Sequence, residues 1–114
     1  MDMQITDLDR NVKKVTFAGR LDTPGVLGIE TQFVTNLVPA GKHAIVDLSK
    51  VDFVGSMAIR MFISVSRILR EKQAKLALYA PQGMVNEVFE IARLKDVVPV
   101  CADATEATAA VQRQ

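Results

Sequence analysis

The sequence predicts an α/β fold: a single domain, residues 1–114, in which a mixed sheet of about five strands packs with about four helices. Two segments with alternating apolar residues open the chain, and short apolar segments then alternate with segments of helical periodicity. Strands separated by helices pair in parallel through right-handed crossovers, whereas a short turn joins two strands into an antiparallel hairpin. The sheet is therefore expected to combine an N-terminal hairpin with parallel strands.

The N-terminal hairpin is predicted from two alternating segments. Met1, Met3 and Ile5 alternate with polar residues, and so do Val15 and Phe17 in the second segment. Such alternation is typical of strands with one buried face. The polar residues between the two segments are expected to form the turn.

The first helix is expected to begin at Thr23-Pro24, because a hydroxyl there can cap free N–H groups and proline is tolerated in the first turn. It should end at about Leu37, before Pro39. The spacing of its apolar residues places four of them against the sheet: Val26, Ile29, Phe33 and Leu37.

The middle of the chain predicts a buried strand over 43–48, followed through a short loop by an amphipathic helix over 56–72. At 100° per residue, polar side chains form one narrow stripe of the helix: Arg60, Ser64, Arg67 and Glu71. Apolar side chains fall on the opposite side: Ala58, Phe62, Val65 and Leu69.

The last third predicts a strand over 76–79, a helix over about 83–94, an irregular or edge strand over 97–101, and a C-terminal helix opened by a capping box at Asp103 and Glu106. The inward residues of the helix over 83–94 follow the i, i+3, i+4, i+7 pattern: Val85, Val88, Phe89 and Ala92.

Composition excludes several functional classes. The formal net charge of +1 gives no basic field for direct nucleic-acid binding. No apolar run is long enough to insert into a membrane, and the start of the chain lacks a signal-peptide pattern, so a cytoplasmic protein is expected. Cys101 and His43 are single residues of their kinds, which favours structural roles. No cofactor and no metal are expected.

The segment around Ser56 stands out, because it leads from a buried strand into the amphipathic helix. A serine at a helix start can cap free N–H groups, and a phosphate added there would meet both donors and the positive end of the helix dipole. The residues alone leave both interpretations open: a plain cap and a regulatory site.

The residues around this segment resemble the STAS domain family, the anti-sigma factor antagonists of bacteria. Val46-Asp47-Leu48-Ser49 is similar to the family's strand ending, and 51–54 to its Val-x-Phe connector. Gly55-Ser56-Met57-Ala58-Ile59 resembles the Asp-Ser-Ser-Gly-Leu that opens the family's helix, and Gly19-Arg20-Leu21-Asp22 resembles its Gly-x-Leu-Asp. The similar order of elements covers nearly the whole chain.

The resemblance implies a non-enzymatic protein-interaction switch. A typical member binds a serine kinase that is also an anti-sigma factor, and phosphorylation of a serine at the helix start releases it. Here Gly55 replaces the family's aspartate, and Met57 occupies the position of the phosphorylated serine. Binding is then constitutive or regulated elsewhere, with Ser56 as the alternative phosphorylation site.

The partner is expected to contact the end of the early hairpin and the start of the amphipathic helix. Met57, Met61 and Ile68 form the candidate docking ridge, although they could equally seal the helix against its neighbours. The expected partner-binding residues are Asp22, Thr23, Gly55, Ser56, Met57, Arg60 and Met61.

Two other functions stay open. The chain could be a STAS subunit or scaffold that docks on a transporter ATPase or signalling complex. It could also bind a small ligand, or catalyse a reaction, at the carboxyl ends of the strands, where Asp22, Asp52 and Ser56 are the available polar groups. The oligomeric state, including a homodimer, is not fixed by the sequence.

Overall fold

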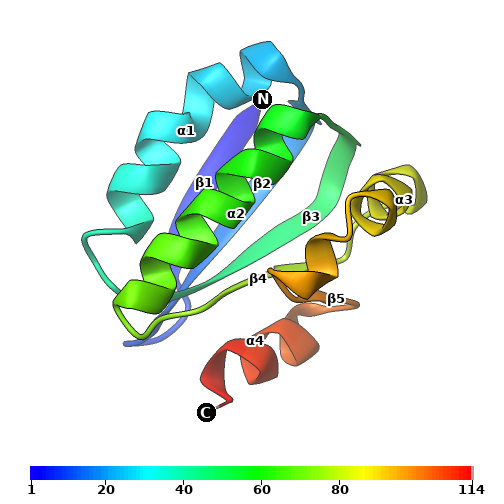
Figure 1. The fold of residues 1–114 in the computed structure, drawn as a ribbon. Helices are drawn as coiled ribbons and strands as arrows, with labels where there is room; N and C mark the ends of the chain where they lie inside the picture. Colours follow the sequence, from blue (N-terminus) through cyan, green and yellow to red (C-terminus); the bar gives the residue numbers. More distant parts are fainter. Residues whose placement is uncertain (114) are drawn as a thin grey trace.

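The computed structural model describes residues 1–113 as one five-stranded sheet with helices on both faces (Figure 1). The strands lie in the order β1-β2-β3-β4-β5; β1 pairs antiparallel with β2, and all later neighbours are parallel. This confirms the predicted α/β class and mixed sheet. The elements in chain order are β1 (Asp2–Asp7), β2 (Val12–Leu21), α1 (Thr23–Leu37), β3 (His43–Val54), α2 (Ser56–Glu71), β4 (Leu76–Tyr79), α3 (Gly83–Ile91), a 3₁₀ turn (Leu94–Asp96), β5 (Val100–Cys101) and α4 (Ala104–Gln112).

The hairpin turn is closed by its own side chain. The Asp9 carboxylate accepts hydrogen bonds from the backbone N–H groups of Asn11 and Val12, at 2.7 and 3.0 Å. An aspartate that binds the backbone two or three residues later favours a turn over a continued strand. Lys13 and Asp7, which face each other across the hairpin, add an ion pair at 3.2 Å.

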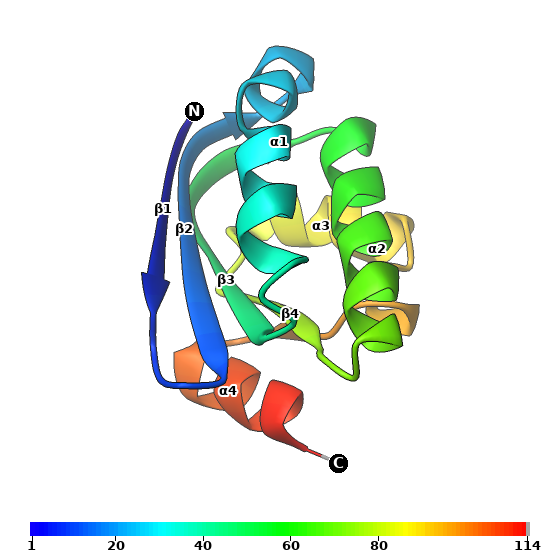
Figure 2. The same ribbon diagram turned by 90° about the vertical axis from the view of Figure 1, so that its left-hand side faces the viewer.

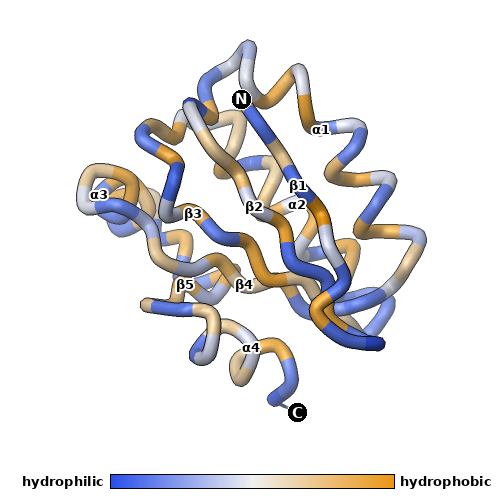
Figure 3. Tube along the Cα trace, turned by 180° about the vertical axis from the view of Figure 1, so that it is seen from behind, coloured by the Kyte–Doolittle hydropathy of each residue, from blue (hydrophilic) through white to orange (hydrophobic). Residues whose placement is uncertain are grey.

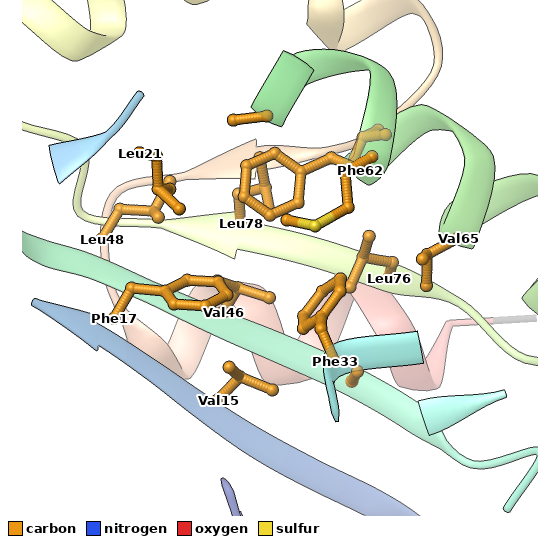
Figure 4. Packing of buried hydrophobic residues seen from close by; sticks show 14 of the residues in the cluster. Val15, Phe17, Leu21, Phe33, Val46, Leu48, Phe62, Val65, Leu76 and Leu78 are labelled. Atoms are coloured by element: carbon orange, nitrogen blue, oxygen red, sulfur yellow. The ribbon is translucent and has the colours of Figure 1, made fainter. Parts of the chain in front are cut away.

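The main core lies between one face of the sheet and helices α1 and α2, which cover that face side by side (Figure 2). Its centre is a cluster of three fully buried rings, Phe17, Phe33 and Phe62, whose centroids are 5.5–6.3 Å apart (Figure 4). Such tilted pairs add about 0.5–1.5 kcal/mol each to the burial term. The predicted inward residues of the first two helices are all buried, as expected from their periodicity.

The opposite face of the sheet is covered only in part. Helix α4 packs over the β4 and β5 end of this face, where Ala107 and Val111 contact a second apolar cluster that includes Ile45, Tyr79 and Cys101. Seen from this side, no helix of residues 1–113 lies over β1 and β2 (Figure 3). On this face, the side chains of β1 and β2 are mainly the polar ones that alternate with their buried apolar residues.

Two predicted element boundaries in the middle of the chain are wrong. The buried strand does not end at Leu48: β3 continues to Val54, because residues 50–54 pair with the end of β2. The first helix is capped by Asp22 and not by Thr23, since the Asp22 carboxylate accepts from the Gly25 N–H at 2.9 Å. The residue before the helix has the extended backbone that capping needs.

The last third also differs from its prediction. Helix α3 ends at Ile91, because Arg93 takes a left-handed conformation with φ of 56° and a 3₁₀ turn follows. Ala92 is therefore exposed and does not face inward. The strand predicted over 97–101 shrinks to Val100–Cys101. The Asp103 cap is confirmed, with its carboxylate accepting from the Glu106 N–H at 2.9 Å.

Candidate functional site

The candidate site lies where the ends of β2 and β3 meet the starts of α1 and α2, which are at the same end of the sheet (Figure 1). The Gly55 N–H donates to the Leu21 carbonyl at 3.0 Å, so the two strand ends are joined just before the helices begin. This contact brings together the two segments that the sequence analysis singled out, the one around Asp22 and the one around Ser56.

Asp22 has a structural role at this site. One carboxylate oxygen caps α1, and the other pairs with the Arg20 guanidinium at 3.3 Å. The hydrogen bond from Gly25 and the charge and hydrogen bond of Arg20 hold the pKa of Asp22 below its ordinary value, against a smaller opposing effect of burial. Asp22 is half-buried, while the neighbouring Thr23 is exposed.

The start of α2 has no side-chain cap. Gly55 occupies the cap position in an extended conformation, so Ser56 is the first helical residue and does not cap the helix as expected. Ser56 is exposed, and its hydroxyl makes no hydrogen bond with a residue of 1–113. Arg60 is also exposed, and the first turn of α2 carries no acidic residue. The positive end of this helix therefore faces solvent beside a serine hydroxyl.

The predicted methionine ridge is only partly at the surface. Met57 is half-buried against the core, and Ile68 is 36% exposed. Met61 is 2% exposed, so its assignment as a partner-binding residue is wrong. The 100° spacing places Met61 at the edge of the buried face of α2. The neighbouring elements cover a wider part of the helix surface, which includes Met61. Met57 is the member of the ridge that lies next to Ser56.

Sequence reasoning missed three residues at this end of the sheet. The Arg20 guanidinium lies over the Phe53 ring at 4.4 Å from its centroid, a cation–π contact beside the Asp22 ion pair. Phe53 is 38% exposed and Met84, in the first turn of α3, is 75% exposed. Both border a small apolar hollow of about 80 Å³, together with Asp52, Val54, Val85 and Val88.

A signal for these residues was present in the sequence. Met84 falls outside the apolar repeat of α3, and Phe53 stands between a charged and a buried residue of β3. Large apolar side chains that the core does not use are candidates for an interaction surface. We name the surface formed by Arg20, Thr23, Phe53, Ser56, Met57, Arg60 and Met84 the α2 surface.

The single histidine and the single cysteine of the sequence are the other candidates for chemistry. His43 lies at the start of β3, at the other end of this strand, where its Nδ1 accepts from the Lys75 N–H at 3.0 Å. His43 is therefore not placed to act as a base on the Ser56 hydroxyl. Cys101 is buried, and burial raises the pKa of its thiol, which disfavours the reactive thiolate.

Two further properties concern residues 1–113. No group of three His, Cys, Asp or Glu side chains lies close enough together to hold a metal ion in this part of the chain. Each helix in it is too short or too polar to cross a membrane.

Comparison with known proteins identifies the family. The family model described as STAS domain matches residues 4–107, which is nearly the whole chain. The chain belongs to the STAS domain family. Its sequence is 30% identical over 82 residues to BtrV of Bordetella bronchiseptica, which carries the name anti-sigma factor antagonist; the match covers 72% of this chain and 70% of BtrV.

Other members of the family extend the comparison. The anti-sigma-B factor antagonist of Listeria monocytogenes is 22% identical over 100 residues, which are 88% of each chain. The STAS fold of this chain matches the anti-sigma factor antagonist SpoIIAA in its unphosphorylated form with a TM-score of 0.78 and 21% identity, over 97% of this chain and 96% of SpoIIAA. SpoIIAA in its phosphorylated form matches with a TM-score of 0.70.

Proposed function

We propose that this STAS domain is a non-enzymatic anti-sigma factor antagonist that binds a serine-kinase anti-sigma factor through the α2 surface. Binding would free a sigma factor and so regulate transcription. The observation that carries the proposal is the surface itself: exposed Phe53 adjoins Gly55 at the uncapped start of α2, and exposed Met84 borders the same apolar hollow as Phe53. The names of the relatives support the class of partner.

The regulation of this binding would differ from the family pattern. Met57 stands at the position of the phosphorylated serine, and a thioether has no hydroxyl to accept phosphate. Because Met57 is half-buried beside exposed Ser56, it can supply apolar contact area to a partner that leaves the core undisturbed. Binding is then constitutive, unless Ser56 takes the phosphate in its place.

A charge at position 57 tests the location of the interface. Met57→Asp places a carboxylate at the proposed contact, where an apolar side chain of the partner would otherwise be buried against it. We expect the dissociation constant to rise at least about tenfold, which is about 1.4 kcal/mol. Isothermal titration with the purified partner measures it. Met57 packs partly against the core, so the variant loses some stability, which the helix dipole offsets in part; a melting curve checks that the variant is folded at the titration temperature.

The matched control adds the same charge elsewhere on the same helix. Ser64→Asp lies on the exposed polar stripe of α2, two turns from position 57, and should leave the affinity within a factor of two. Equal loss in both variants would indicate a general charge effect, and an unchanged affinity of Met57→Asp would remove the α2 surface from consideration.

The class of partner is tested separately, by affinity capture from the native cell followed by mass spectrometry. A kinase-like ATPase supports the proposal. A transporter ATPase or a signalling assembly would instead support the scaffold function that the STAS fold also allows.

A further inference from the structure

A second site lies at the opposite end of the molecule from the α2 surface. A cavity of about 480 Å³ opens between the C-terminal half of α2, the start of β4, the segment before β5 and α4. Cavities of roughly 300–1,000 Å³ are the size that holds small molecules in proteins. The residues that line it are Ser66, Arg70, Gln73, Ala74, Lys75, Leu76, Pro99 and Ala110.

The charge of this cavity has one sign. Arg70 and Lys75 both line it, and no carboxylate is among the lining residues. Each cation has a backbone carbonyl as partner, Val97 for Arg70 and Arg113 for Lys75, and neither forms an ion pair within residues 1–113. Carbonyl contacts occupy part of their donors, and within residues 1–113 neither cation is paired with a carboxylate. A bound anion would therefore gain two charge-assisted contacts.

The end of α2 does not oppose such an anion with free carbonyls. The Leu69 carbonyl accepts from the N–H groups of Lys72 and Ala74, at 2.9 and 2.8 Å, and the Arg70 carbonyl accepts from Gln73 at 2.9 Å. Gln73 has a φ of 63°, which turns the chain sharply and brings Lys75 back beside Arg70. The local backbone thus pairs its own acceptors while it gathers the two cations.

The interior of the cavity is suited to an apolar body. Four of its lining residues are apolar: Ala74, Leu76, Pro99 and Ala110. Ser66 is 2% exposed and adds a polar side chain to the lining of the cavity.

We propose that this cavity binds a small monocarboxylate with an apolar chain. The carboxylate of the ligand accepts hydrogen bonds from the Arg70 guanidinium and the Lys75 ammonium. The apolar chain of the ligand lies against Ala74, Leu76 and Ala110. The site is independent of the α2 surface.

Octanoate is the probe that tests this site, with ¹H–¹⁵N spectra of the full chain as the readout. We expect saturable shifts confined to the amides that surround the cavity, those of Ser66, Gln73, Leu76 and Ala110. Arg70→Gln with Lys75→Gln should weaken octanoate about tenfold, as expected for lost contacts to a charged group. Ala110→Leu, which fills the cavity, should weaken it as well.

Two ligand controls and one variant separate the alternatives. Arg67→Gln removes an exposed charge from the polar stripe of the same helix and should leave octanoate affinity unchanged. Binding of 1-octanol as tight as octanoate would overturn the role of the cations, and equal binding of inorganic phosphate would reduce the site to a general anion patch. Shifts that do not saturate, or that spread over the surface, would overturn the site altogether.

Discussion

Tyr79, at the end of β4, has its hydroxyl buried without a hydrogen bond to a residue of 1–113. Burial, together with the carboxylate of Asp47 on the neighbouring strand, raises the pKa of Tyr79 to about 12. The neutral phenol is therefore favoured in the folded state. Because the unfolded chain ionises near pH 10 and the folded chain near pH 12, the unfolded state releases its proton first, and stability falls as pH rises through this window.

Tyr79→Phe tests this description of the residue. At pH 7 we expect a change in unfolding free energy of less than about 1 kcal/mol, because the variant removes a buried polar group that has no partner to lose. Between pH 10 and 12 the variant should lose less stability than wild type. Urea unfolding at pH 7, 10 and 11.5 measures both effects. Parallel loss in the two proteins over the alkaline range would contradict the raised pKa.

Residues were predicted well where periodicity fixes their orientation and poorly where neighbouring elements decide. All four inward residues expected of α1 are buried, because 3.6-residue periodicity fixes which face meets the sheet. Asp22 and Thr23 can both cap a helix, and only the backbone path at the end of β2 selects Asp22. Met61 was misplaced because the period gives its direction but not how far the surrounding elements cover α2.

Helix α1 offers a matched test at the scale of an element, because two of its glycines meet different surroundings. A Cβ at Gly25 would lie 2.2 Å from the Arg20 carbonyl oxygen, whereas a Cβ at Gly28 would meet nothing within 4 Å. Gly25→Ala should therefore destabilise by roughly 1–3 kcal/mol, as backbone must move to relieve the clash.

Gly28→Ala should instead stabilise by about 0.5–1 kcal/mol, because alanine restricts the unfolded chain and favours the helix. Urea denaturation of both variants against wild type measures the pair. Equal destabilisation by the two alanines would show that α1 does not begin against the end of β2 as described. The contrast matters for function, since the start of α1 holds Asp22 and Thr23 in the candidate site.

Elements were predicted in the correct order, but their ends were not. The sequence predicts a short loop between the buried strand and α2, whereas pairing with β2 extends β3 to Val54. That extension places Phe53 beside Arg20, a contact that no local pattern contains. The reduced β5 has the opposite cause: Pro99 and the left-handed Arg93 restrict the backbone before it.

At the scale of the whole molecule, the two sites lie at opposite ends of the mixed sheet. The α2 surface lies around the start of α2, and the end of α2 with α4 borders the cationic cavity. Helix α2 runs between these two ends of the molecule (Figure 1). The alternation of strands and helices was enough to predict the sheet, because parallel crossovers leave few topologies. The exposed Phe53 and Met84, and the cavity, depend on contacts between distant segments and could not be predicted from any one of them.

The most direct measurement is a phosphorylation assay with the captured partner kinase and ATP. Mass spectrometry identifies the phosphorylated residue, and titration measures the affinity for the partner before and after phosphorylation. Gly55→Asp combined with Met57→Ser restores the family's acceptor residues, and a Cβ at Gly55 has room, 3.6 Å from the Phe53 ring. Gly55→Asp alone is the control without a hydroxyl at position 57.

We expect the double variant to take phosphate at position 57 and then to bind the partner at least about tenfold more weakly, because a doubly charged group enters an apolar contact. Wild type and the control should stay bound. Phosphorylation at position 57 that leaves binding unchanged, or a partner that never modifies the restored acceptor, would contradict the proposal that the α2 surface is a kinase contact from which the acceptor has been lost.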